Sequence, residues 1–302
     1  MAASLGLGTY RINPKTMALS VALANMDADT AWVDTAPNYL GGLAQELLAP
    51  SLFRFPKVAV SSKVGFLSTD AAIAAVHEGI LTAEEADAEH CLNPRYVEWQ
   101  GRRNCAELGK KQLDVMFVHN PEQAKGDLYE LLKDTFGAME SLVSEGAIES
   151  YGVATWDGFQ SGRMQVKELD KVAAEAAGTR KHHLKAIQLP VSLVMSDAFE
   201  QALEGKGPIS EAAELGWQVL ASAPLFGGEL PELAHKDLTA LIAPALTIPA
   251  ACILAVASCP GVTRVLLSAS TPSHWLEAYE ATIKPTIPAP ALRKVFDVLS
   301  SD

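Results

Sequence analysis

Short runs of apolar residues recur along the chain, and several are apolar at consecutive positions, as strands buried on both faces are. Between them, apolar residues repeat at helical spacing, and two of these stretches end at Gly109 and Gly146, as helices often do. The predicted strands are 4–10, 31–35, 57–62, 113–119, 150–155, 185–190, 217–222 and 264–269. The predicted helices include 14–29, 93–111, 127–148, 161–178 and 209–216.

The alternation of strands and helices predicts an α/β fold, a (β/α)8 TIM barrel. Parallel strands need crossover connections, which helices usually supply. Such a barrel takes about 250 residues, so a chain of 302 leaves room for an insertion, which we place at 64–93 after the third strand. No linker divides the chain, and we expect one domain over residues 1–302. An open doubly wound sheet is the alternative, but no glycine-rich phosphate loop follows the first strand.

One uncharged segment, 238–263, is long enough to span a bilayer. Pro244 and Pro249 interrupt it, Ala and Thr dilute it, and no basic cluster flanks it. We therefore expect a proline-divided pair of buried segments in a soluble protein rather than a membrane span. The first ten residues also lack the basic and apolar regions of a signal peptide.

The charge and the cysteine content argue against some classes of partner and site. The net charge of −12 argues against nucleic acid as a partner, because phosphates would be repelled. The four cysteines show neither CxxC spacing nor a nearby histidine cluster, so we expect no metal site and a reduced, cytoplasmic protein. Cys252 and Cys259 are seven residues apart, and we expect them to share one helix face as buried thiols.

Polar residues follow the predicted strands at the end where barrel enzymes build their active sites. Along the chain they are Asp34 and Tyr39, Lys63, His119 and Asn120, Thr155, Gln188 and Ser222. Each alone has a structural explanation, such as a lysine reaching water or a histidine bonded to a backbone carbonyl. Four ionisable groups at one barrel mouth, however, form a chemically coherent set.

The chemistry that this set suggests is proton donation to a carbonyl. A phenol has a pKa of about 10 and is a poor acid at neutral pH. A nearby ammonium lowers that pKa, a carboxylate holds the ammonium in place, and a neutral imidazole can orient a carbonyl oxygen. Since no side chain donates hydride, a nicotinamide cofactor would have to supply it.

Eight sequence elements, in order, resemble those of the aldo-keto reductases. They are "LGLGTY", "VDTAPNY", "VSSK", "LDVMFVHNP", "GAIESYGVAT", "AIQLP", "ASAPLFGG" and "CPGVTRVLLSASTPSHWLEA". The matches span essentially the whole chain. The resemblance implies a barrel that binds NADPH and reduces a small-molecule carbonyl substrate, an aldehyde or a ketone.

The resemblance also implies roles for individual residues. Tyr39 would be the proton donor, Lys63 and Asp34 would tune it, and His119 would orient the carbonyl. The implied cofactor contacts are Thr155 and Gln188 at the nicotinamide, Thr9 and Tyr10 beside both cofactor and substrate, Ser222, Leu225 and Gly227 along the pyrophosphate, and Ser268, Ser270, His274 and Glu277 around the adenosine half. From their positions after the fourth and fifth predicted strands, Asn120 and Trp156 are candidates for the substrate pocket, and a turn around Pro121 explains Asn120 equally well.

Some positions depart from the family pattern. Ser222 stands where the family stacks an aromatic ring on the nicotinamide, and Ala154-Thr155 replaces a common Ser-Asn pair. Ser268 and His274 stand where a lysine and an arginine often bind the adenosine 2′-phosphate. A largely neutral histidine is a poor substitute for a guanidinium fork. The preference for NADPH therefore rests on the resemblance, and NADH is left open.

Two alternatives to a reductase remain at this point: a nicotinamide-binding barrel that acts as a redox-neutral lyase or isomerase, and a non-catalytic binding subunit. The insertion at 64–93 is equally compatible with a lid over the site and with a surface ornament. The substrate and the oligomeric state are not determined by the sequence.

Overall fold

The computed structural model describes residues 2–233, 237–269 and 271–299. The strands are β1 (Ser4–Gly8), β2 (Trp32–Asp34), β3 (Ala59–Val64), β4 (Leu113–His119), β5 (Ile148–Ala154), β6 (Leu184–Pro190), β7 (Gln218–Ser222) and β8 (Arg264–Leu267). Each strand pairs in parallel with the next, and β8 pairs with β1 to close the barrel. The predicted (β/α)8 fold is confirmed, and every predicted strand is present.

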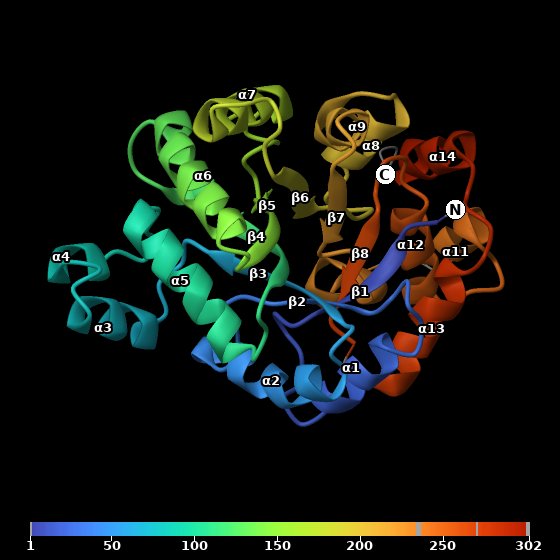
Figure 1. Ribbon diagram of the computed structural model, residues 1–302. Helices are drawn as coiled ribbons and strands as arrows, with labels where there is room; N and C mark the ends of the chain where they lie inside the picture. Colours follow the sequence, from blue (N-terminus) through green and yellow to red (C-terminus); the bar gives the residue numbers. More distant parts are fainter. Residues whose placement is uncertain (1, 234–236, 270, 300–302) are drawn as a thin grey trace.

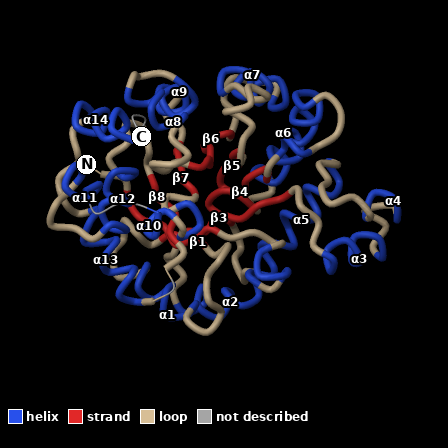
Figure 2. Tube along the Cα trace, turned by 180° about the vertical axis from the view of Figure 1, so that it is seen from behind, coloured by secondary structure: helices blue, strands red, loops and turns tan. Residues whose placement is uncertain are grey.

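Helices surround the barrel (Figures 1 and 2). They are α1 (Met17–Ala24), α2 (Ala44–Arg54), α3 (Thr69–His77), α4 (Ala83–Ala86), α5 (Pro94–Glu107), α6 (Leu128–Ser144), α7 (Val166–Ala177), α8 (Asp197–Leu203), α9 (Gly207–Glu214), α10 (Leu230–Leu233), α11 (Asp237–Ile242), α12 (Ile248–Ala257), α13 (Pro272–Thr282) and α14 (Ala289–Leu299), with 3-10 turns η1 (Tyr39–Gly42), η2 (Pro121–Gln123) and η3 (Phe226–Gly228). The five predicted helices correspond to α1, α5, α6, α7 and α9.

The first residues of α5 and α1 show where the local sequence was sufficient to predict a helix start and where it was not. The side chain of Asn93 accepts a hydrogen bond from the backbone N–H of Arg95 at 3.0 Å and caps α5, whose first residue is Pro94, close to the predicted helix start at residue 93. In contrast, α1 does not begin at Pro14. The Thr16 N–H donates to the Asn13 carbonyl at 3.0 Å, so a turn comes first.

The interior of the barrel has an apolar layer and a polar layer. The apolar layer consists of Trp32, Val115, Phe117, Ala154, Ala186, Leu220 and Leu266. Since alternate residues of a strand face the same side, Asp34 and Gln188 lie one step beyond Trp32 and Ala186, toward the carboxyl ends of their strands. Residues of opposite parity, such as Val33, belong to the core between the barrel and the helices.

The uncharged segment 238–263 contributes to α11 and α12. Residues 250–257 are buried throughout α12, Pro244 lies between the two helices, and Pro249 lies in the first turn of α12. The prediction that Cys252 and Cys259 share a helix face is wrong, because the helix ends at Ala257 and proline follows Cys259, although both thiols are buried. Within the described residues, no helix combines the length and apolar character needed to cross a membrane.

The insertion at 64–93 is present as an arm after β3. Its helices α3 and α4 stand apart from the barrel in both views, so the tip of the arm does not cover the barrel mouth (Figures 1 and 2). Its base is a short antiparallel bridge between Phe66 and His90. The tip is thus a surface feature, whereas the base starts directly from the end of β3.

Candidate active site

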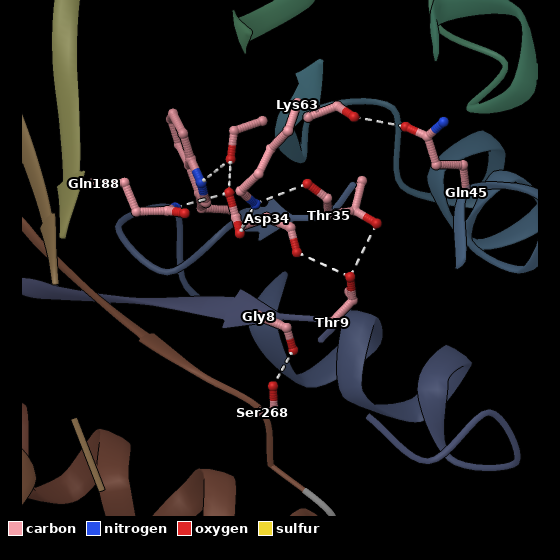
Figure 3. Close-up of polar contacts among 11 residues, drawn as sticks. Gly8, Thr9, Asp34, Thr35, Gln45, Lys63, Gln188 and Ser268 are labelled. Atoms are coloured by element: carbon pink, nitrogen blue, oxygen red, sulfur yellow. Dashed lines mark hydrogen bonds and ion pairs between the residues drawn. The ribbon is translucent and has the colours of Figure 1, made fainter. Parts of the chain in front are cut away.

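A buried ion pair lies at the centre of the candidate site (Figure 3). Lys63 Nζ lies 2.6 Å from Asp34 Oδ2 and also donates to the carbonyl of Thr35 at 2.9 Å. Asp34 Oδ1 accepts hydrogen bonds from Ser61 Oγ at 2.7 Å and from Gln188 Nε2 at 3.0 Å. Strands β2, β3 and β6 therefore supply one connected polar network inside the barrel.

Lys63 is 0% exposed, so its charge depends on its neighbours. Burial lowers the pKa of Lys63, but the charge and hydrogen bond of Asp34, together with the Tyr39 phenol, raise it by more. The pKa therefore lies above the ordinary value of 10.5. Lys63 is an ammonium ion at neutral pH, as the sequence analysis expected.

Tyr39 lies next to this pair, at the start of η1, where Leu40 and Gly41 have φ values of 52° and 67° and turn the chain sharply. Lys63 Nζ is 4.8 Å from the centre of the Tyr39 ring. Burial raises the pKa of Tyr39, and the Lys63 charge lowers it by a smaller amount, so the pKa lies above 10.0. The ammonium lowers the pKa of Tyr39, as predicted, but desolvation outweighs it, so the phenol is not more acidic than an ordinary tyrosine.

His119 ends β4 and faces Tyr39. The two ring centres are 5.9 Å apart with an interplanar angle of 78°. Burial lowers the pKa of His119 well below 6.5, and the charge of Lys63 acts in the same direction. The imidazole is therefore neutral at neutral pH, which is the state that the predicted orienting role requires.

These groups border a cavity of about 570 Å³, a size typical of small-molecule sites, which span about 300–1,000 Å³. Most of the predicted site residues line it: Thr9, Tyr10, Asp34, Tyr39, His119, Asn120, Thr155, Trp156, Gln188, Ser222, Leu225, Gly227 and Ser268. Lys63 lies behind Asp34 and Tyr39. Trp156, which is 52% exposed, also borders a neighbouring cavity of about 260 Å³.

Several predicted cofactor residues have hydrogen bonds within the protein. Thr155 Oγ1 accepts the backbone N–H of Gly158 at 2.8 Å. Ser268 Oγ donates to the carbonyl of Gly8 at 2.8 Å and ties the end of β8 to β1 (Figure 3). Gln188 is bonded to Asp34, as described above. The structure places these residues around one cavity, and their cofactor roles remain predictions.

The predicted adenosine contacts lie farther out. His274 and Glu277 belong to α13, and within the described part of the chain neither is part of the cavity wall. The Glu277 carboxylate accepts a hydrogen bond from the hydroxyl of Thr247. The predicted residue Ser270 lies outside the described residues. No group of three potential metal ligands is found among the residues that the structure describes.

Sequence reasoning missed several residues of the site. Ser61 could have been found, because it precedes Lys63 by two positions and so faces the same side of β3. Arg11 and Phe66 line the cavity from loops, for which no periodic signal exists. Arg11 Nη1 donates to the carbonyl of Gly227 at 3.0 Å and joins the loops after β1 and β7.

Comparisons with known proteins agree with this geometry. The sequence model described as the aldo/keto reductase family matches residues 3–240. A curated D-threo-aldose 1-dehydrogenase from a Pseudomonas species is 29% identical over 170 residues, which is 50% of this chain and 50% of that protein. The match thus spans only half the length of that relative.

Two solved structures show the same fold. An aldo/keto reductase from Klebsiella pneumoniae, in complex with NADP and acetate, has a TM-score of 0.67 at 20% identity, covering 98% of this chain and 90% of that one. A glycerol dehydrogenase from Gluconobacter oxydans has a TM-score of 0.71 at 15% identity, covering 99% and 92%.

Proposed function

The chain belongs to the aldo/keto reductase family, and from this premise we propose that it is an oxidoreductase that reduces an aldehyde or ketone to an alcohol, with Tyr39 as proton donor. The observation that carries the proposal is the arrangement of one phenol on the cavity wall, with the buried Lys63 ammonium behind it and a neutral imidazole facing it. A binding subunit that performs no chemistry has no evident need for all three.

The chain's own residues account for the proton. When bound, a reduced nicotinamide supplies the hydride that adds to the carbonyl carbon. The Tyr39 hydroxyl gives its proton to the carbonyl oxygen, and the neutral His119 ring donates a hydrogen bond that orients this oxygen. The products are an alcohol and the oxidised cofactor. In the reverse direction, Tyr39 acts as the base.

The ion pair sets how readily Tyr39 gives up that proton. A raised pKa keeps Tyr39 protonated at neutral pH, which a donor requires. Lys63 limits the rise, because its positive charge stabilises the phenolate that remains after proton transfer. Asp34 fixes the ammonium within 2.6 Å. The ammonium therefore opposes the penalty that burial imposes on the phenolate, and the Asp34 charge, which acts in the other direction, has the smaller effect.

We propose NADPH as the cofactor, which the Klebsiella neighbour with bound NADP supports. In this proposal Thr155, Gln188 and Ser222 would contact the nicotinamide end, which is supported by their position on the wall of the same cavity as Tyr39 and His119. Gly227 has a φ of 69°, which favours glycine, and without a side chain its backbone can be approached closely. NADH is the competitor in the test.

The substrate is proposed only as a class, a small-molecule carbonyl compound. The cavity wall offers the amides of Asn38 and Asn120 beside the rings of Tyr10 and Trp156, a mixture that suits a hydroxylated carbonyl compound. The partial similarity to an aldose dehydrogenase points to the same class. Aldoses therefore belong in the substrate panel together with simple aldehydes and ketones.

Calorimetry with NADPH and NADH, followed by absorbance at the reduced-nicotinamide band with this panel, tests the proposal. Tyr39→Phe removes only the hydroxyl, so we expect unchanged cofactor binding and a turnover reduced about 10²–10⁴-fold, the usual contribution of general acid catalysis. Cofactor binding without turnover of any carbonyl would favour the redox-neutral or binding-subunit alternatives. Absence of binding to both cofactors would refute the reductase.

A further inference from the structure

The base of the arm after β3 touches the backbone of His119. His90 Nε2 lies 2.7 Å from the carbonyl oxygen of His119. A carbonyl can only accept, so Nε2 carries the proton and donates it. His90 Nδ1 is buried and has no partner among the described residues. The ring is thus placed for one hydrogen bond, the one to His119.

Gly65 makes this contact possible. A Cβ atom at this position would lie 2.7 Å from His90 Nε2 and 2.9 Å from the His119 carbonyl oxygen, and the φ of 137° also favours glycine. The Cys91 N–H donates to the backbone carbonyl of Gly65 at 2.7 Å, and the Leu67 N–H donates to the backbone carbonyl of Glu89 at 3.1 Å. These bonds hold the returning strand of the arm against the end of β3.

Phe66 connects the same two histidines through their rings. Its ring centre lies 5.2 Å from that of His90 at an interplanar angle of 89°, and 4.8 Å from that of His119 at 81°. His119 in turn meets Tyr39 edge-on. Edge-to-face contacts at these distances are favourable for aromatic rings. A continuous row of rings therefore runs from the arm to the candidate proton donor.

The His119 ring needs such support. Within the described part of the chain, no hydrogen bond from the protein reaches either of its ring nitrogens, so packing alone sets its orientation. The backbone is constrained next to it, because Asn120 has a φ of 45° and its N–H donates to the Ala154 carbonyl at 2.6 Å. The His119 carbonyl is the point at which the arm can hold this strained backbone.

We propose that His90 and Phe66, at the base of the arm, are positioning residues that hold the His119 ring in its working orientation toward Tyr39. The proposal rests on the proposed function of the site. His90 faces His119 and, at longer range, Glu122, and burial lowers its pKa. It is therefore neutral at neutral pH and keeps the Nε2 proton that the contact uses.

The test compares three variants. His90→Phe keeps the ring packing but loses the donor, His90→Gln can restore an N–H donor, and His77→Phe is the matched control on an exposed position of the same arm. We expect His90→Phe to lower kcat about tenfold to a hundredfold, the effect of a misplaced catalytic group, with an unchanged Kd for NADPH. His90→Gln should recover most of kcat, and His77→Phe should change nothing.

A second readout does not depend on turnover. In protein with isotope-labelled histidine, the ring resonances of His119 should move in His90→Phe and stay in place in His77→Phe. Unchanged resonances and kcat in folded His90→Phe would overturn the proposal, as would a loss of kcat that follows the melting temperature and that His90→Gln does not restore. If the wild type reduces no carbonyl, the proposed function fails, and the resonances alone decide the positioning role.

Discussion

The two sides of the barrel mouth are built differently. On the side of β2 to β4, Asp34, Tyr39 and Lys63 are at most 9% exposed, and packing or hydrogen bonds fix each of them. On the side of β7 and β8, the candidate cofactor residues that the structure describes lie at the end of β7, in the segments that follow β7 and β8, and on α13, where His274 is exposed. The first side holds its side chains in one arrangement, whereas the second presents exposed polar groups.

The difference shows where stability and function compete. Removing one member of a buried ion pair leaves the other charge without compensation. Substitutions on the side of β2 to β4, called the acid–base side below, therefore lower the free energy of unfolding. Exposed polar residues contribute little to the free energy of folding, so they can be substituted to suit a ligand at little cost in stability. We therefore expect substitutions at β2 to β4 to affect turnover and stability together, and substitutions on α13 to affect affinity alone.

The largest expected effect is that of Lys63→Met. The Asp34 carboxylate would remain buried without its cation, and we expect the free energy of unfolding to fall by about 3–5 kcal/mol. The pKa of Tyr39 would rise further, because the opposing charge is lost, and kcat should fall about 10²–10⁴-fold. Urea unfolding and steady-state kinetics measure the two effects.

Lys133→Met is the matched control for this variant. Lys133 pairs with Glu175 at 3.3 Å, but both side chains are more than 40% exposed. Such a pair contributes about 0–1 kcal/mol, and the variant should keep its turnover. Equal stability of Lys63→Met and Lys133→Met would contradict the view that the acid–base side is part of the fold's energetics.

The effect of pH on the rate of reduction should be smaller than that of Lys63→Met, and the rate should change only on the alkaline side. Reduction needs Tyr39 protonated and His119 neutral. Burial raises the pKa of Tyr39 above 10.0 and lowers that of His119 well below 6.5. The rate should therefore form a plateau through pH 6.5 to 10 and fall at higher pH as Tyr39 loses its proton, at most about tenfold per pH unit.

The lowered pKa of His119 also determines how the free energy of unfolding changes with pH. The unfolded chain takes up a proton at His119 below pH 6.5, while the folded chain resists it, so the free energy of unfolding falls as the pH drops from 6.5 toward the lowered pKa. Rate profiles and urea unfolding at several pH values check both statements. A rate that declines between pH 7 and 9 would count against Tyr39 as the donor with a raised pKa.

The smallest expected effect lies on the opposite side. His274→Arg adds a guanidinium fork on α13, and we expect it to tighten NADPH binding about tenfold, equivalent to about 1.4 kcal/mol, with no change for NADH. His274→Gln, which adds no charge, is the control. An equal gain for both cofactors would show that the residue does not face the 2′-phosphate.

The sequence was sufficient for the fold because barrel strands carry a local signal. Runs such as 113–119 are apolar at nearly every position, and the residue that ends each strand lies at the barrel mouth once the strands are parallel. The approximate places of Asp34, Lys63, His119 and Gln188 follow from that rule. Ser61 follows from it too, through the two-residue period of β3.

What the sequence by itself determined is therefore the barrel and the approximate places of the candidate acid–base groups at its mouth, since both follow from where the strands lie and end. Only the tertiary structure decided the net pKa of Tyr39, because burial and the Lys63 charge oppose each other and their balance depends on three-dimensional surroundings. It also decided the contact between His90 and His119. That contact joins residues 29 positions apart in the sequence. It depends on the path of the irregular arm between them, which no local sequence pattern specifies.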